Sequence, residues 1–391
     1  MIKKLIRYTK NSIGQNKLIK PNTNSIVKLK TKFISKGIAL ISYGNTFLDL
    51  KDDDSAFDGH SSKWELKKIV EIFLDLGYDV DAISPYDTEF IPQKTYDVIF
   101  DIHYNLCRFE KFLSKKTITI LYSTGSYPEY AANREIERVN NLVYRKKMAY
   151  KPKRICDPIY FTKSLDIAKF CFLIGNDHTL STFPHKYQKK IRLTSVTYSN
   201  SIIKDLNDPL GKEFLWFYGY GAVHKGLDIL LDFFSNNSEY ILNIVGNIEA
   251  EKDFVDIYNN ELYNKSNIKY HGFLSPVSIE FQNIITKSFC FIAPSCSESI
   301  STAVITCLNI GLYPIYSIDN GLELNKNGYL LKNCNYTDIE SAIDIVINKK
   351  ESEIKKVVLE NRKYVQSSFS RNYFTNIMTK NLKEVLFNGN R

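Results

Sequence analysis

The sequence lacks the features that mark a membrane-spanning or secreted protein. No apolar run approaches the roughly 20 residues that a membrane-spanning helix needs. The opening stretch MIKKLIRYTK contains neither an apolar core of signal-peptide length nor a small-residue cleavage site. The seven cysteines include no C-x-x-C pair, and an odd number without a framework is typical of a reducing compartment. We therefore expect a soluble, unsecreted, cytoplasmic protein with mostly buried thiols.

Acidic residues are missing from the N-terminal end of the chain. Residues 1–48 contain ten Lys or Arg and no Asp or Glu, whereas the net charge of the whole chain is +9, so the remaining residues sum to −1. Basic residues mixed with a few apolar ones can bind an anionic membrane surface, which would make residues 1–30 a peripheral attachment to the inner face of the membrane. The alternative is a solvated, partly disordered tail. Because the rest of the chain shows no basic stripe, we expect no nucleic acid partner.

Motifs for metal binding and for several well-known reactions are also absent. The six His show no H-x-x-x-H spacing, and no G-x-S-x-G, G-x-G-x-x-G or P-loop motif occurs. The acidic runs DDD (52–54) and DVD (79–81) are better explained as a solvated loop and a sheet end than as magnesium ligands. We therefore predict no metal site and no bound cofactor.

The pattern of apolar residues predicts an α/β protein with two doubly wound domains. A chain of 391 residues is too long for one ordinary hydrophobic core. Apolar runs of strand length alternate with helical or loop segments, which is typical of parallel sheets covered by helices on both faces. These runs are 37–43, 78–84, 96–102, 117–123 and 169–175 in the first half, and 214–219, 240–246, 267–272, 289–295 and 312–318 in the second half.

Clusters of turn residues and changes in charge suggest the domain boundaries. We predict a basic tail at 1–33, an N-terminal Rossmann-like domain at 34–205, a C-terminal Rossmann-like domain at 206–370 and a last helix within 371–391. Doubly wound domains bind ligands at the carboxyl ends of their strands. A functional site is therefore expected in the turns that connect strands to helices.

One such turn is WFYGYGAVHKG, residues 216–226. Gly219 and Gly221 would let the backbone approach a ligand closely, and the helix that follows would present free N–H groups. Lys225 adds a full positive charge at this helix start, which suits a diphosphate, and His224 beside it is a second donor. The alternative is an ordinary glycine turn with an exposed lysine.

A second turn is APSCSESIST, residues 293–302. It joins a buried strand to a helix whose start carries the hydroxyls of Ser299, Ser301 and Thr302 and a single carboxylate, Glu298. Free N–H groups and hydroxyls can bind a sugar or phosphate oxygen, and a carboxylate can bind two sugar hydroxyls. A Glu at a helix start also complements the helix dipole, which is the simpler explanation when the turn is considered by itself.

The first half has its own residues at the ends of strands. Gly59 and His60 precede a predicted helix, His103 follows the third apolar run, and Thr124 and Gly125 follow the fourth. A His at the end of a strand that faces a crevice can bind a substrate hydroxyl or assist proton transfer. A lone His is more often a polar residue with ordinary hydrogen bonds.

Together these segments resemble the donor-binding domain of GT-B glycosyltransferases, most closely glycosyltransferase family 4. The resemblance implies two Rossmann-like domains facing a cleft, with the C-terminal helix crossing back to the first domain. It also implies a nucleotide diphosphate sugar as donor substrate, retention at the anomeric carbon and no obligatory metal. The segments that carry it, in the order of the family, are 214–231, LNIVG (242–246), 267–275, 293–311 and NGYLL (327–331).

The resemblance assigns roles to individual residues. Lys225 matches the lysine that binds the donor diphosphate, whereas Tyr220 stands where the family has an arginine. Glu298 matches the first of two glutamates separated by seven residues, which approaches the donor sugar, and Thr306 stands where the second one binds the ribose. Ser299 replaces the usual glycine. The other predicted donor-binding residues are Gly219, Gly221, His224, Gly226, Gly246, Ile300, Ser301 and Thr302, and those on the acceptor or sugar side are Gly59, His60, Thr124 and Gly125.

We therefore expect an enzyme that transfers a hexose to a hydroxyl of a glycan or lipid-linked acceptor in surface polysaccharide synthesis. Its expected catalytic residues are Glu298, Lys225 and His103. Because Tyr220 and Thr306 stand in place of a charged arginine and a charged glutamate of the family, the alternative is a catalytically degenerate GT-B protein that binds glycan or partners an active transferase. A nucleotide-sugar epimerase of similar fold would need a paired acid and base that the sequence does not show.

Overall fold

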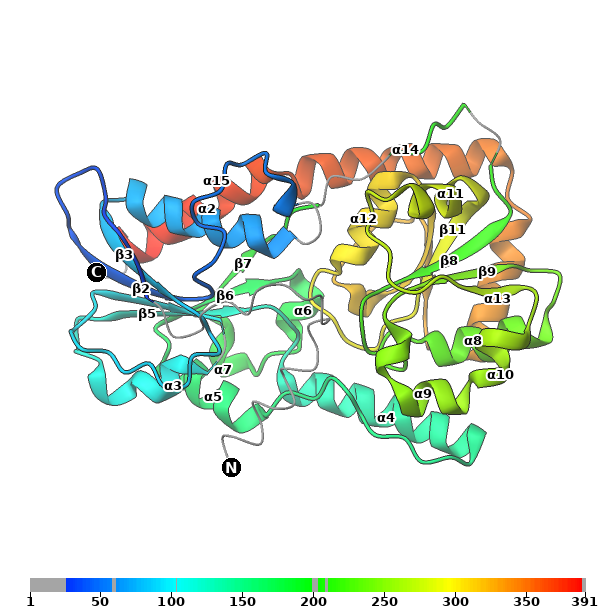
Figure 1. Cartoon of the computed structure of the whole chain (residues 1–391), viewed down its shortest axis with the longest axis horizontal. Coiled ribbons are helices and arrows are strands. Elements are labelled where there is room, and N and C mark those ends of the chain that lie inside the picture. The colour runs from blue at the N-terminus through cyan, green and yellow to red at the C-terminus, as the bar shows by residue number, and fades with distance from the viewer. Residues whose placement is uncertain (1–25, 58–60, 103, 199–202, 208–209, 389–391) are drawn as a thin grey trace.

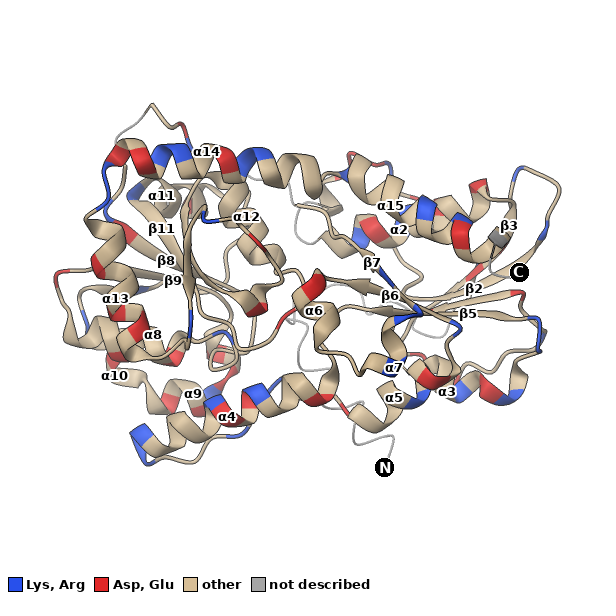
Figure 2. Ribbon diagram, turned by 180° about the vertical axis from the view of Figure 1, so that it is seen from behind, with Lys and Arg blue, Asp and Glu red and all other residues tan. Residues whose placement is uncertain are grey.

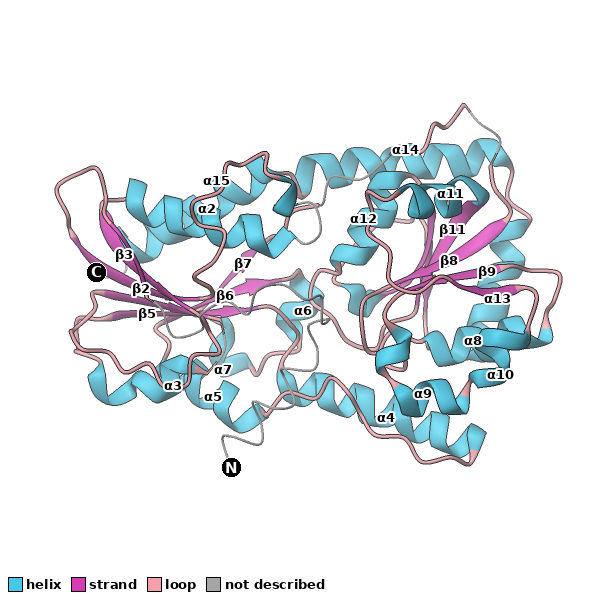
Figure 3. Ribbon diagram, viewed as in Figure 1, coloured by secondary structure: helices cyan, strands magenta, loops and turns pink. Residues whose placement is uncertain are grey.

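Two α/β lobes lie side by side in the computed structural model of the chain, which describes residues 26–57, 61–102, 104–198, 203–207 and 210–388 (Figure 1). Each lobe has a central sheet with helices on both of its faces (Figure 3). The fold class predicted from the sequence is confirmed, because continuous apolar runs can be buried on both faces only when helices cover the sheet on both sides.

The first lobe contains a seven-stranded sheet in the order β1-β3-β2-β4-β5-β6-β7. All neighbouring strands are parallel except β1, which runs antiparallel to β3. The strands are β1 (Val27–Leu29), β2 (Gly37–Ser42), β3 (Tyr78–Ile83), β4 (Val98–Asp101), β5 (Ile118–Ser123), β6 (Phe170–Ile174) and β7 (Ile191–Thr194).

The second lobe contains a six-stranded, all-parallel sheet in the order β10-β9-β8-β11-β12-β13. Each apolar run predicted as a strand contains one strand of the two sheets. The pattern does not predict β1, β7 and β13, because these strands are short and half-exposed. The strands of the second sheet are β8 (Glu213–Phe217), β9 (Leu242–Val245), β10 (Ile268–Tyr270), β11 (Ser288–Ala293), β12 (Tyr313–Ser317) and β13 (Tyr329–Leu331).

Strand β1 corrects the predicted extent of the basic tail. The segment 1–33 was expected to lie outside the sheet, but Val27–Leu29 pairs with β3 as an edge strand. Val27 and Leu29 pack against the core, while Lys28 between them is exposed. Three alternating residues are too few to distinguish a strand from a tail by periodicity.

The helices of the first lobe lie on both faces of its sheet (Figure 1). One face carries α2 and α15, and the other carries α3, α5 and α7. The helices of this lobe are α2 (Ser61–Asp75), α3 (Asn105–Phe109), α4 (Pro128–Lys146), α5 (Pro158–Ile167), α6 (Asp177–Ser181) and α7 (His185–Gln188). Those that follow in the chain are α8 (Leu227–Asn236), α9 (Lys252–Ile257), α10 (Asn259–Asn264), α11 (Ile279–Lys287), α12 (Thr302–Ile310), α13 (Tyr336–Ile347), α14 (Glu351–Ser368) and α15 (Arg371–Lys383).

The C-terminal part of the chain crosses back to the first lobe, as predicted. Helix α14 runs along the second lobe toward the first, and α15 packs against α2 (Figure 1). Phe374 contacts Trp64 edge-on with ring centroids 6.1 Å apart. Asn381 donates a hydrogen bond of 3.0 Å to the carbonyl of Leu193 at the edge of the first sheet. The last helix therefore holds the lobes together.

Helix α4 joins the lobes in a second way. It follows β5 of the first lobe but lies along the second lobe, beside α8, α9 and α10, where basic residues on α4 face acidic ones (Figure 2). Arg145 pairs with Asp228 at 2.5 Å and with Asp232 at 2.9 Å. Lys146 pairs with Asp232 at 2.7 Å and with Glu261 at 3.2 Å. Val139 and Leu142 of α4 are also buried in the hydrophobic core, so apolar contacts and ion pairs together hold this helix against the second lobe.

None of the helices in the described ranges combines the length and the apolar character that spanning a membrane requires.

Candidate functional site

Two turns of the second lobe form the centre of the candidate site. They follow the neighbouring strands β8 and β11, so both lie at the carboxyl edge of the sheet. The ammonium of Lys225 contacts the carboxylate of Glu298 directly. His224 Nε2 lies 3.5 Å from Glu298 Oε1, and the backbone N–H of Cys296 donates to the carbonyl of His224 at 3.0 Å. The structure thus brings together the predicted residues Lys225, His224 and Glu298.

The glycine at the end of the first turn permits this close approach. Gly226 has a φ of +76°, in the left-handed region that favours glycine. A Cβ at this position would lie 2.6 Å from Cγ of Pro294 and 2.7 Å from the guanidinium of Arg138. Gly226 therefore serves the packing of one turn on the other, which is a structural reason for the glycine that the sequence analysis placed among donor-binding residues.

The cluster is buried, and no free gap separates its charges. Only 5% of Lys225 and 4% of His224 is exposed. Burial lowers the pKa of Lys225 well below its ordinary value, and the nearby charge of Arg154 acts in the same direction. The positive charge of Lys225 therefore depends on the carboxylate of Glu298 beside it. The side chains of Lys225 and Glu298 fill the space between the starts of the two turns' helices, so a donor has no open place there in this structure.

Four backbone amides of the glycine turn, those of Gly221, Ala222, Lys225 and Gly226, have acceptors within the protein. The N–H groups of Gly221 and Ala222 both donate to Oε1 of Glu251, at 2.7 and 2.9 Å. Those of Lys225 and Gly226 donate to carbonyls within the turn, at 2.8 and 3.0 Å. The expectation that these amides are available to a diphosphate is wrong for this conformation, because a buried carboxylate from η3–α9 takes the place of the anion. The 3₁₀ helix η3 spans Ile248–Ala250.

The imidazole of His224 is held by a carboxylate from the other lobe. Its Nδ1 lies 3.3 Å from Oε2 of Glu135 on α4. Burial acts to lower the pKa of His224, but the Cys296 thiol and the Glu135 carboxylate outweigh it and the pKa is raised. Burial acts to raise the pKa of Glu135, but His224 and two backbone N–H groups lower it below its ordinary value. Both shifts favour an imidazolium–carboxylate pair that crosses between the lobes.

The second turn contacts the first lobe through its serines. Ser299 donates to the carbonyl of Thr124 at 2.9 Å, and Ser126 donates to the carbonyl of Glu298. The N–H of Ser301 is taken by the carbonyl of Asn320 at 3.1 Å. The predicted residues Ser299 and Thr124 are therefore partners of each other across the lobes.

Two of the remaining predicted donor residues, Thr306 and Gly246, have hydrogen-bond partners within the protein. The hydroxyl of Thr306, which is 3% exposed, donates to the carbonyl of Thr302 one helical turn earlier, at 2.8 Å. The N–H of Gly246 donates to the carbonyl of Gly272 at 2.9 Å. Tyr220 is half-buried, and burial raises its pKa to about 12. Gly219 is exposed, and Gly125 has open space where a side chain would begin.

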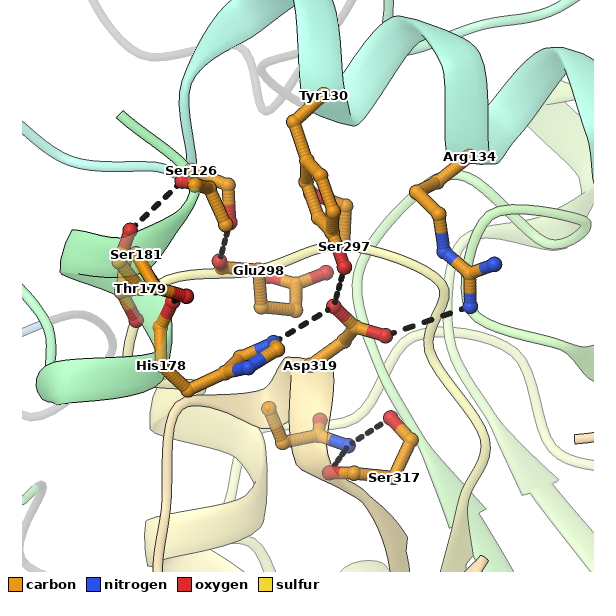
Figure 4. Close-up of polar contacts among 12 residues, drawn as sticks. Ser126, Tyr130, Arg134, His178, Thr179, Ser181, Ser297, Glu298, Ser317 and Asp319 are labelled. Carbon is orange, nitrogen blue, oxygen red and sulfur yellow. Dashed lines mark hydrogen bonds and ion pairs between the residues drawn. The ribbon is translucent and has the colours of Figure 1, made fainter. Parts of the chain in front are cut away.

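Asp319, which the sequence analysis did not select, connects the lobes at a second point (Figure 4). It lies in the 3₁₀ helix η4 (Ile318–Asn320), directly after β12, and its carboxylate accepts a hydrogen bond from Tyr130 at 2.8 Å. His178 Nε2 lies 3.1 Å from the same oxygen, and the guanidinium of Arg134 is 3.6 Å from the other. The only sign of Asp319 in the sequence is an acidic residue directly after a predicted strand. This position does not indicate that three residues of the other lobe contact it.

Two cavities lie between the lobes. One, of about 430 Å³, lies between α4 and the second lobe and is lined by Arg134, Arg138 and Cys296 among others. The other, of about 370 Å³, is lined by Gly175 and Asn176 of the first lobe and by Ile300 and Gly321 of the second. Ile300 is a predicted donor-side residue, and it places this second cavity next to the turn that carries Glu298.

Three predicted residues lie outside the described ranges: Gly59, His60 and His103. Their roles stay predictions. Within the described ranges, no group of three or more His, Cys, Asp and Glu is arranged to hold a metal ion.

Comparison with known proteins places the two turns in a family context. Residues 199–363, less than half of the chain, match the family model described as "Glycosyl transferases group 1". This range includes Lys225 and Glu298. A comparison with curated proteins found no matching sequence.

Solved structures of glycosyltransferases share the fold. Sucrose-phosphate synthase from Thermosynechococcus elongatus superposes with a TM-score of 0.58 at 15% identity, over 89% of this chain and 98% of that one. HepE from Anabaena in complex with UDP-glucose has a TM-score of 0.50 at 11% identity, over 88% and 99% of the two chains. HepE in complex with UDP and glucose has a TM-score of 0.51 at 10% identity, over 74% and 78%. The chain has the GT-B fold, with a group 1 glycosyltransferase match in its second lobe.

Proposed function

We propose that the protein is a glycosyltransferase that moves a hexose from a nucleotide diphosphate sugar to a glycan or lipid-linked acceptor in surface polysaccharide synthesis, with retention. The observation that carries this proposal is the cluster of Lys225, His224 and Glu298, formed by two turns at the carboxyl edge of one parallel sheet. Its position inside the segment that matches the group 1 model supports it. Ligands of doubly wound sheets bind at this edge.

In the proposed reaction, Lys225 and the imidazolium of His224 stabilise the negative charge that develops on the leaving diphosphate, so that no metal is obligatory. Glu298 orients the donor sugar by accepting hydrogen bonds from the hydroxyls of the sugar. His103, which lies outside the described ranges, would bind the sugar or the acceptor. For the donor to bind, the direct contact between Lys225 and Glu298 has to break, each group then taking one end of the donor.

The proposal is tested with a panel of UDP, GDP and ADP sugars, with EDTA present throughout. We expect one donor to release its nucleoside diphosphate slowly to water and faster with a saccharide acceptor. We also expect the matching nucleoside diphosphate to raise the melting temperature, because it binds only the folded chain. The proposal would be contradicted if no member of the panel released its nucleotide and none of the nucleotides raised the melting temperature.

The second candidate function is that of a degenerate GT-B protein without activity. Three observations favour it: Lys225 and Glu298 neutralise each other, Glu251 occupies the amides of the glycine turn, and the hydroxyl of Thr306 is bound within its helix. Such a protein would bind a glycan or a partner transferase. A thermal shift with saccharides alone, without release of nucleotide from any donor, would support this candidate over the first.

We further propose that residues 1–25, which lie outside the described ranges, attach the enzyme to an anionic membrane surface. Deleting these residues leaves the edge strand β1 in place. We expect the truncated protein to lose sedimentation with vesicles of anionic lipid at low salt, while its melting temperature and its activity on a soluble acceptor stay unchanged. Vesicles of neutral lipid are the control, and equal sedimentation of both proteins with anionic vesicles would exclude the attachment.

A further inference from the structure

We infer that Arg154, which the first lobe places against the glycine turn of the second, is the further cation that binds the diphosphate end of the donor. This inference rests on the proposed function and names a binding residue for it. Arg154 lies beyond the end of α4, far in sequence from both turns of the site.

The backbone of Arg154 is held next to the charged cluster. Its N–H donates to both carboxylate oxygens of Glu135, each at 3.1 Å, and the N–H of Lys153 donates to the same group at 2.7 Å. The same carboxylate lies 3.3 Å from the imidazole of His224. One buried glutamate therefore connects the Arg154 backbone to the residue that precedes Lys225.

The side chain of Arg154 lies over the glycine turn. A Cβ on Gly221, whose φ is +92°, would be 2.5 Å from Cδ of Arg154 and 3.2 Å from its Cγ. The glycine thus leaves room for the aliphatic part of the arginine. Burial lowers the pKa of Lys225, and the charge of Arg154 lowers it further; burial raises the pKa of Tyr220, and the charge of Arg154 opposes this effect.

Lys153 and Arg145 near Arg154 have acidic partners, whereas Arg154, like Lys147 and Lys151, forms no ion pair among the described residues. Lys153 pairs with Asp253, and Arg145 pairs with Asp228 and Asp232. Arg154 as a residue is exposed. Two cations, Arg154 and Lys225, face the same turn, and an anion between them would relieve their repulsion.

The glycine turn needs such a cation if it is to hold a diphosphate. Its amides at Gly221 and Ala222 are taken by Glu251, so these two backbone donors do not contribute to the binding. The carboxylate of Glu251 also brings negative charge to the turn. Lys225 alone, which shares its charge with Glu298, would leave most of the charge of a diphosphate unbalanced. An arginine reaches two phosphate oxygens at once through its planar group.

The test compares Arg154→Gln with Lys151→Gln, an exposed lysine of the same segment. Titration calorimetry with UDP, GDP and ADP identifies the nucleotide that the wild type binds, and the matching nucleoside without phosphate is titrated in parallel. We expect Arg154→Gln to weaken binding of the nucleoside diphosphate by about 10- to 100-fold, as the loss of a charge-assisted contact implies, and to leave the nucleoside unchanged. Lys151→Gln should bind both as the wild type does.

A second-site variant tests the position of the charge. Tyr220→Arg places a cation on the same turn, and in the Arg154→Gln background it should recover most of the lost affinity for the nucleoside diphosphate. Wild-type affinity in Arg154→Gln, or an equal loss for nucleoside and nucleoside diphosphate, would overturn the inference while leaving the proposed function intact. A wild type that binds none of the three nucleotides would overturn the proposed function, and this inference with it.

Discussion

Replacing Lys225 by methionine is expected to lower kcat/KM for the nucleotide sugar by about 10²- to 10³-fold, the usual effect of removing one group that stabilises charge in a transition state. Methionine keeps most of the volume of the side chain, so the buried position stays filled. The measurement is steady-state release of the nucleoside diphosphate with the donor identified by the panel.

Two controls separate this effect from misfolding. Lys212→Met changes an exposed lysine of the same lobe and should have wild-type kinetics. The Lys225→Met variant leaves the carboxylate of Glu298 without its cation, so its melting temperature should fall, and the double variant with Glu298→Gln should recover stability without activity. Wild-type turnover in Lys225→Met would remove this residue from the mechanism.

Replacing Glu298 by glutamine is expected to separate catalysis from nucleotide binding. Turnover should fall by about 10- to 100-fold, because a charge-assisted contact with the sugar is lost. Affinity for the nucleoside diphosphate should rise, because the phosphate no longer competes with a carboxylate for Lys225 and itself supplies the negative charge that keeps the buried lysine protonated. Single-turnover rates and calorimetry measure the two quantities separately.

Glu280→Gln is the matched control for this variant. Glu280 lies exposed in the first turn of α11, where a carboxylate complements the helix dipole and has no other role in the structure's contacts. It should lose neither activity nor affinity. Should Glu298→Gln behave like Glu280→Gln, then Glu298 would be an ordinary helix-start residue and the degenerate reading of the protein would gain support.

The two central residues of the site were predictable because topology brings their turns together. In a parallel doubly wound sheet every strand ends at the same edge, so the turns after neighbouring strands must meet. Sequence reasoning could therefore select Lys225 and Glu298 from the turns that carry them. It could not foresee that their side chains contact each other, because the distance between two side chains depends on how closely the turns pack.

Residues that contact the site from another lobe or another turn could not be predicted from the sequence. Glu251, which lies between η3 and α9, accepts hydrogen bonds from the amides of Gly221 and Ala222. Glu135 contacts His224 from α4. A single charged residue in a polar segment looks the same in the sequence whether it faces water or a site formed by distant residues. This applies to the carboxylates of Glu251 and Glu135 and also to Arg154.

The apolar runs predicted most strands of the two sheets and the turns at which a ligand would bind, because strands buried on both faces need continuous apolar residues. The short, half-exposed strands β1, β7 and β13 were not predictable in this way. Only the tertiary structure decided that α4 lies along the second lobe, that Glu251 occupies the glycine turn and that Asp319 binds three residues of the first lobe. These arrangements depend on polar contacts between residues that are far apart in the sequence. No periodic pattern in the sequence marks such contacts.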